Sequence, residues 1–200
     1  MIHDLDRTLD VLLRRELPTE LANQVTISFA TPDDQFPPAS VTLPAIDLFL
    51  YDVRENRELR SNEWLVERRS NGTTTRQPPP ARVDCSYFIT AWPSENVPNA
   101  AQDEHRLLGE VMRVLLRHST LPEAVLQGSL AGQEPPLPTS VLHPGRLQSL
   151  GEFWQALGGK PKAALNYTVT IGVTTREPEE TGPPVIDQRL RFHTGSGREE

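Results

Sequence analysis

Cys85 is the single cysteine of the chain and its strongest candidate nucleophile. A cysteine attacks as the thiolate, so a catalytic cysteine needs a histidine or another cation that lowers its pKa. Cys85, however, shares its parity with Val83, Tyr87 and Ile89 in a segment of alternating residues. Residues of one parity lie on one face of a β-strand. The pattern therefore predicts a buried cysteine that packs as a small hydrophobic side chain.

The histidines do not form a metal-binding pattern in the sequence. No two of them have the i, i+4 spacing that places two ligands on one face of a helix. A single thiol can supply neither a multi-cysteine zinc site nor an internal disulfide. The histidines are His3, His105, His118, His143 and His193. We therefore expect no metal and no cofactor.

Two other patterns look functional but favour structural interpretations. Asp47 and Asp52 lie five residues apart in one predicted strand, which places their side chains on opposite faces. We expect them to form structural or interface ion pairs rather than an acid–base pair. Gly158-Gly159-Lys160 follows a predicted helix and precedes Pro161. A phosphate-binding loop runs from a strand into a helix, so these glycines predict the end of a helix instead.

Length and charge narrow the class of protein. The 200 residues fit one domain with a tail, and the formal net charge of −7 argues against nucleic-acid binding, which needs a basic surface. No apolar run approaches the roughly 20 residues of a membrane helix. The first residues, Met1-Ile2-His3-Asp4, lack the basic and apolar regions of a signal peptide. We expect a protein that stays in the cytoplasm where it is made and binds neither nucleic acid nor membrane.

Helices are predicted where apolar residues recur at helical spacing. They cover residues 2–17, roughly 100–118 and 149–157. The last begins with a capping box at Ser149 and carries Trp154, which we expect to fill the space between this helix and the sheet. A second capping box, from Thr120 to Glu123, predicts a short helix through Leu126.

Strands are predicted where apolar residues alternate with polar ones or form a short run. They cover residues 46–53, 83–91 and 165–174, with weaker segments at 25–29 and 140–142. The strand at 46–53 is apolar on both faces apart from its aspartates, which predicts a central position. The elements together predict an α/β (α+β) fold with a central mixed, largely antiparallel sheet flanked by helices.

Residues 52–82 are rich in charges of both signs. Asn71-Gly72 predicts the tip of a hairpin, because this pair supplies the positive φ angles of a tight turn. Pro78-Pro79-Pro80 predicts a stiff, extended exit. We expect the hairpin to project as an arm that docks onto a neighbouring subunit, since arginine binds carboxylates bidentately and is enriched at interfaces. The predicted interface residues are Arg54, Glu55, Arg57, Arg68, Arg69 and Arg76. A solvated hairpin without a partner is the alternative.

The chain changes composition at its C-terminal end. Residues 176–200 are rich in Glu, Pro, Gly and Arg and contain few apolar residues. Such a segment cannot bury enough apolar surface to offset the entropy of ordering. It predicts a polar, flexible tail after a domain that covers residues 1–175.

Several segments occur together in an order and spacing that is characteristic of one family. They are Tyr51-Asp52-Val53-Arg54-Glu55-Asn56, Pro78-Pro79-Pro80 leading into Asp84-Cys85-Ser86-Tyr87-Phe88-Ile89-Thr90-Ala91-Trp92, Glu104-His105-Arg106-Leu107-Leu108-Gly109, and Phe153-Trp154-Gln155-Ala156-Leu157-Gly158-Gly159-Lys160-Pro161 running into Ala164-Leu165-Asn166-Tyr167-Thr168-Val169-Thr170. The chain resembles the cap, or tail-terminator, proteins of phage-tail-like extracellular contractile injection systems of the antifeeding-prophage and Photorhabdus-virulence-cassette type.

This resemblance covers residues 1 to about 175 and implies a tail-terminator-like fold. It implies a hexameric ring on the baseplate-distal end of the inner tube and sheath, where the ring stops tube growth and anchors the last sheath layer. The implied partners are further copies of the chain and the tube and sheath proteins of the same particle. The particle would assemble in the cytoplasm of a bacterium and be released from it. The family pattern contains no catalytic residues, so none is carried over.

Two alternatives to a structural cap remain open from the sequence. One is a small hydrolase or transferase that uses Cys85 or a set of histidines and aspartates, and it requires a pocket in which these groups converge. The other is a monomeric adaptor that binds an effector or a particle protein through the arginine-rich hairpin. Removing such an adaptor would leave the length of the particles unchanged.

Overall fold

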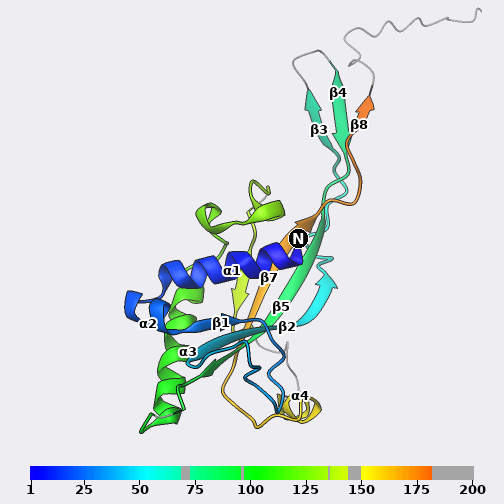
Figure 1. The fold of residues 1–200 in the computed structure, drawn as a ribbon. Coiled ribbons are helices and arrows are strands. Elements are labelled where there is room, and N and C mark those ends of the chain that lie inside the picture. Colours follow the sequence, from blue (N-terminus) through cyan, green and yellow to red (C-terminus); the bar gives the residue numbers. More distant parts are fainter. Residues whose placement is uncertain (69–72, 96, 135, 144–149, 182–200) are drawn as a thin grey trace, which may run out of the picture. The chain divides into compact units, whose positions relative to one another are not determined.

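The structure is a computed structural model that describes residues 1–68, 73–95, 97–134, 136–143 and 150–181 (Figure 1). The chain divides into two compact units. The first consists of Met1–Arg60 and Ala81–Val173. The second consists of Ser61–Pro80 and the chain from Thr174 onward. Each unit has its own sheet.

A five-stranded sheet forms the first unit. Its strands are β1 (Thr26–Ser28), β2 (Ala45–Glu55), β5 (Ala81–Trp92), β6 (Thr139–Val141) and β7 (Leu165–Val173), in the order β1-β2-β5-β7-β6. β1 and β2 are parallel, and every other pair is antiparallel. The predicted mixed, largely antiparallel sheet and its strands are therefore confirmed. The prediction that β2 is central holds only for Ala45–Asp47, where β1 lies beside it.

One face of this sheet carries the main hydrophobic core. The helices α1 (Ile2–Glu16), α2 (Thr19–Gln24) and α3 (Ala100–Leu116) contribute to it, and α1 crosses the strands in Figure 1. Leu5, Leu9 and Leu12 of α1 are fully buried against the same cluster as Cys85 and Tyr87 of β5. The stripe of leucines thus forms the helix that its spacing predicts. The predicted core position of Cys85 is also confirmed.

The opposite face of the sheet is covered in part by α4 (Leu150–Ala156). Phe88 alternates with the core residues Tyr87 and Ile89, so its ring points to this second face. The ring centroids of Phe88 and Phe153 lie 4.7 Å apart, and those of Phe88 and Trp154 lie 5.4 Å apart. Gly158 has a φ of 69° just after the helix and confirms the predicted helix end. Ser149, the predicted cap, lies outside the described residues.

A β-bulge in β2 corrects the prediction for its two aspartates. The register against β5 shifts between Leu50 and Asp52, so that Asp47 lies opposite Thr90 and Asp52 lies opposite Ser86. Thr90 and Ser86 share one face of β5, and Asp47 and Asp52 therefore share a face as well. A bulge adds one residue to one strand and reverses the parity of all that follows. The predicted ion pair exists for Asp52, which contacts Arg54 at 2.6 Å. Asp47 forms no ion pair with any described residue.

The second predicted capping box is also wrong. Residues Glu123–Val125 form a single 3₁₀ turn, η1, whose N-cap is Pro122 and has no side-chain capping bond. Thr120 instead forms a β-bridge with Pro138, and the amide of Leu121 donates to the carbonyl of Leu137. The backbone at Thr120 is thus committed to an extended pairing and cannot start a helix.

A three-stranded antiparallel sheet forms the second unit. Its strands are β3 (Leu65–Arg68), β4 (Thr74–Gln77) and β8 (Glu179–Thr181), in the order β3-β4-β8. The β3–β4 pair confirms a hairpin in this region, although its predicted tip, Asn71-Gly72, lies outside the described residues. Sequence composition predicted a flexible tail from residue 176, yet β8 pairs with β4. Three charged or polar residues are too short a pattern for periodicity to reveal a strand.

We predict that Trp154→Ala destabilises the protein by about 3–5 kcal/mol, because it removes a ring that is 1% exposed from the packing between α4 and the sheet. Urea denaturation of the mutant and the wild type measures this difference. Trp64→Ala is the matched control, since Trp64 is 43% exposed, and its effect should stay within about 1 kcal/mol. Overlapping urea curves for wild type and Trp154→Ala would contradict the packing described for α4.

Candidate interaction surfaces

The first group of predicted interface residues lies at the C-terminal end of β2. Arg54 forms its 2.6 Å ion pair with Asp52, and the hydrogen bond that its guanidinium donates to this carboxylate raises the pKa of the guanidinium. Glu55 lies 3.6 Å from Arg60 and 3.9 Å from Arg57. All five side chains lie at or near the surface. They form local ion pairs that solvent screens strongly.

The second group belongs to the three-stranded sheet. The guanidinium of Arg76 lies 4.9 Å from the centre of the Trp64 ring and 3.4 Å from a carboxylate oxygen of Glu179. Arg76 therefore joins β4 to β8 and to the residue before β3, which is a role within this sheet. Arg68 is exposed at the end of β3 and has no ion-pair partner among the described residues. Arg69 lies outside the described residues.

Exposed apolar residues accompany both groups, and sequence reasoning missed them because it followed the charges. Trp64, Leu65 and Val66 are consecutive and are 43%, 55% and 67% exposed. Val53, next to Arg54, is 47% exposed. Consecutive apolar side chains point to opposite faces of a strand, so β3 presents apolar surface on both sides. The available signal was an apolar run without alternation shortly before the predicted hairpin tip at Asn71-Gly72.

β7 and β2 each extend past the short outer strand beside them, β6 and β1, and the exposed edges of these two extensions differ. On the β7 side, the carbonyl of Pro138 accepts from the amide of Thr170. Farther along, the side-chain amide of Gln133 accepts from the amide of Gly172 at 3.1 Å and donates to its carbonyl at 2.9 Å. Gln133 thus occupies the hydrogen-bonding groups that a further strand would use. Blocking of this kind prevents unwanted edge-to-edge pairing.

The β2 side of the sheet is open along much of its length. β1 pairs only with Ala45–Asp47, and no other described strand lies beyond Leu48–Glu55. The bulge at Tyr51 interrupts this edge. Val53, Arg54 and Glu55 follow the bulge and are all exposed. This short stretch therefore offers unpaired backbone groups to an added strand.

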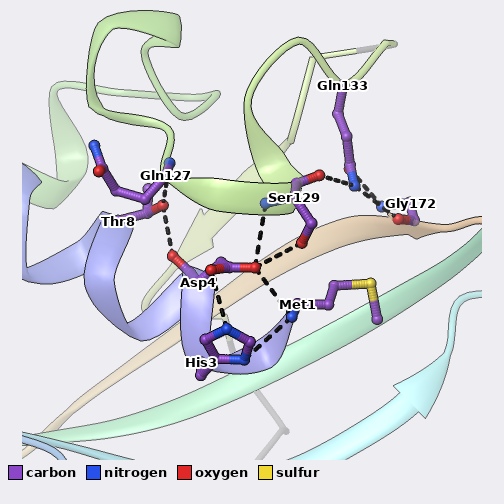
Figure 2. Close-up of polar contacts among 8 residues, drawn as sticks. All are labelled: Met1, His3, Asp4, Thr8, Gln127, Ser129, Gln133 and Gly172. Atoms are coloured by element: carbon purple, nitrogen blue, oxygen red, sulfur yellow. Dashed lines mark hydrogen bonds and ion pairs between the residues drawn. The ribbon is translucent and has the colours of Figure 1, made fainter.

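A polar cluster around the buried side chains of Asp4 and Thr8 holds the start of α1 in place (Figure 2). The carboxylate of Asp4 accepts from the hydroxyl of Ser129 at 2.7 Å and from its amide at 3.2 Å. It also lies 3.1 Å from both the terminal amine of Met1 and Nε2 of His3. The hydrogen bonds from Ser129, with the contact to the amine, hold the pKa of Asp4 well below its usual range. The arrangement favours the ionised form of this carboxylate.

The same cluster fixes the turn that carries Gln133. Thr8 donates to the carbonyl of Asp4 at 2.8 Å and accepts from the amide of Gln127 at 3.0 Å. The 3₁₀ turn η2 (Gly128–Leu130) therefore lies directly on α1, as Figure 2 shows. Gln133 follows this turn and reaches β7. The cluster is structural: it connects α1 to the residue that closes the β7 edge.

A surface groove of about 660 Å³ lies among segments that carry the family resemblance. Trp92, Glu104 and Lys162 line it, together with Gly158, Lys160 and Pro161. Lys162 forms an ion pair with Glu104 and lies 4.5 Å from the centre of the Trp92 ring. Lys162 and Glu104 thus satisfy each other, while Asp33, Asp34, His105 and Lys160 also line the groove.

The titratable groups of the core do not form a reaction centre. Cys85 is fully buried, and this burial raises the pKa of its thiol to about 11. Asp47 is also fully buried, and desolvation raises its pKa to about 7, which Ser28 and the amide of Ala30 offset only in part. Within the described ranges, no group of three His, Cys, Asp or Glu side chains is placed to hold a metal ion. No described helix is long and apolar enough to cross a bilayer.

Comparisons with known proteins agree on one family. The family described as the Pvc16 N-terminal domain matches residues 4–188. Among solved structures, the sheath/tube terminator of the extracellular contractile injection system PVC in its extended state is 25% identical, with a TM-score of 0.70. The tube-terminating cap of the anti-feeding prophage is 26% identical, with a TM-score of 0.65. No curated protein matches the chain at a significant level.

The extent of these matches differs between the chains. The terminator match covers 100% of this chain and 65% of the terminator, and the cap match covers 94% of this chain and 60% of the cap. This chain therefore spans about two thirds or less of the length of either protein. The family match also continues to residue 188, beyond the position near 175 at which the resemblance in sequence was expected to end.

We predict that Gly128→Ala destabilises the protein more than Gly132→Ala does. Both glycines have positive φ angles, 55° and 73°, so both substitutions introduce backbone strain of about 1–2 kcal/mol. Only at Gly128 would the new Cβ meet a neighbour, because it would lie 2.2 Å from a carboxylate oxygen of Asp4. Thermal unfolding compares the two. Equal losses of stability in the two variants would contradict this prediction and show that the side chain of Asp4 moves away from the new Cβ without a loss of stability.

We predict that Asp47→Asn stabilises the protein at alkaline pH and not at acid pH. Between its unfolded pKa of about 4 and its folded pKa of about 7, Asp47 loses its proton only on unfolding, so wild-type stability falls as the pH rises through this window. Asparagine cannot ionise, and its advantage should reach about 2–4 kcal/mol at pH 8 and vanish near pH 4. Urea unfolding at both pH values measures it. If the difference in unfolding free energy between Asp47→Asn and wild type were the same at both pH values, the buried, protonated carboxyl of Asp47 would be contradicted.

Proposed function

Because the chain belongs to the Pvc16 N-terminal domain family, we propose that it acts as the cap of a contractile injection particle and terminates the inner tube and the sheath. The observation that carries this proposal is the match over 100% of the chain to a sheath/tube terminator, with a TM-score of 0.70. The second match, to a tube-terminating cap, supports the same role.

The proposed cap is a ring of identical copies, six by the family resemblance, at the baseplate-distal end of the particle. In this position it stops tube growth and anchors the last layer of the sheath. Its partners are the neighbouring copies and the tube and sheath proteins. A ring requires two different, complementary surfaces on each copy, since identical surfaces would close a dimer. Arg54, Glu55, Arg57 and Arg68 are our proposed contributors to these surfaces.

The proposed role is structural and not catalytic. Two features support this choice: the thiol of Cys85 is buried with a raised pKa, and the groove near Trp92 contains an ion pair that is already formed. The chain would assemble with the particle in the cytoplasm of a bacterium and leave with it. The monomeric adaptor remains the competing function. The length of particles made without this chain distinguishes the cap from the adaptor.

We predict that particles produced without this chain lose their uniform length, because nothing then ends tube and sheath polymerisation at a fixed point. Electron micrographs of particles from a strain that lacks the gene measure the length distribution. The same strain supplied with the intact gene on a plasmid is the control and should recover uniform particles. Particles of unchanged, uniform length without the chain would exclude a cap and favour an adaptor.

A further inference from the structure

Two short, exposed strand segments in this chain have complementary sequences. One is Val53-Arg54-Glu55, on the open outer edge of β2, and the other is Val66-Glu67-Arg68, in β3. β3 is an edge strand, and all four of its residues are exposed. Each segment thus combines an unpaired backbone edge with exposed side chains. Segments of this kind accept an added strand.

The order of the residues selects one alignment of the two segments. If they run parallel and in register, Val53 lies beside Val66, Arg54 beside Glu67, and Glu55 beside Arg68. This alignment forms one apolar contact and two pairs of opposite charge. Neighbouring side chains on one face of a sheet contribute to pairing, and like charges oppose it. An antiparallel alignment centred on Arg54 and Glu67 retains one opposite-charge pair and places each valine beside a charged residue.

The parallel alignment requires a second copy of the chain. β2 ends at Glu55 and β3 begins at Leu65, so nine residues connect them. Two parallel neighbouring strands of one chain need a crossover connection of about a dozen residues or more. The connection inside one chain is therefore too short, whereas β3 of another copy can reach the edge without this restriction.

We propose that β3 of each copy adds in parallel to the Val53–Glu55 edge of β2 in the next copy. This inference rests on the proposed ring and names its two surfaces. The contact joins different surfaces on the two copies, which is the head-to-tail arrangement that closes a ring. The β7 edge cannot serve in this way, because Gln133 already bonds both backbone groups of Gly172.

The existing ion pairs do not prevent this exchange of partners. Arg54 and Glu55 now contact Asp52 and Arg60, but the side chains of Arg54 and Arg60 are 62% and 63% exposed. Exposed ion pairs contribute little to stability. Replacing them with pairs across a newly covered strand edge therefore costs little. Arg76 keeps its place against Trp64 and Glu179 within the small sheet.

Disulfide cross-linking of the assembled protein tests the register. Adjacent residues of parallel strands lie about 4.8 Å apart, which is within the Cα separation that a disulfide spans. Cys85 is fully buried, so introduced cysteines are the only accessible thiols among the described residues. Val53→Cys with Val66→Cys in one chain should yield a ladder of covalent multimers under mild oxidation. Val53→Cys with Arg68→Cys, which fits the antiparallel alignment, should yield at least tenfold less.

Mixing single-cysteine proteins separates the possible contacts. Val53→Cys mixed with Val66→Cys should give covalent dimers and nothing larger, because each chain has one accessible thiol. Dimers formed by Val66→Cys alone would show a symmetric β3–β3 contact and would overturn the proposal. A stronger signal from the Arg68→Cys pair would overturn the parallel register.

Charge exchange gives a second, independent test. Arg54→Glu and Glu67→Arg should each weaken assembly roughly fivefold, and the double variant should restore it, because the pair is re-formed with reversed signs. Light scattering against protein concentration measures the assembly. If rings form normally but the Val53–Val66 cross-link and the rescue by charge exchange are both absent, this interface is refuted and the proposed cap function is not. Failure of the wild type to form rings, with no cross-link, would count against both.

Discussion

The structure depends on β5, which must bury both of its faces. Tyr87 and Ile89 face the leucines of α1, and Ser86 and Phe88 face the opposite side, yet all four are at most 1% exposed. A strand that is buried on both faces needs a cover on each side and a paired neighbour at each edge. The leucine-rich helices, the aromatic residues of α4, and the strands β2 and β7 supply these. The surfaces that stay available for contact with other proteins include the unpaired strand edges and the separate three-stranded sheet.

Most of the elements around β5 could be predicted because their signals are local. The leucine spacing of α1 and the alternation of β5 and β7 are properties of the sequence itself. The wrong predictions arose where a segment far away in the sequence determines the local backbone conformation. The bulge at Tyr51 exists only in register with β5, and Thr120 is drawn out of a capping box by its pairing with Pro138. Neither partner can be recognised from the residues beside these positions.

Sequence composition pointed to some residues of the candidate surfaces and not to others, for a similar reason. The charged residues at Arg54 and Arg68 stand out in composition, and their place at an interface stays a prediction. Gln133 was not, because a lone glutamine in a polar loop gives no sign that its amide will bond Gly172, 39 positions farther along the chain. The exposure of Val53 and Val66 was also hidden, because apolar residues in strands are usually buried. Knowing which edges are open required the strand order.

The exposed edges of β7 and β2 differ in whether they can accept a further strand. The β7 edge is closed by Pro138 and Gln133, and Gln133 is held by a turn that the Asp4 cluster fixes to α1. The β2 edge is left open after the bulge. A protein with two open edges could add strands on either side and grow into irregular aggregates. Blocking the part of β7 beyond β6, while the part of β2 beyond β1 stays unpaired, removes one of these modes of addition. A ring needs one contact that is repeated from copy to copy.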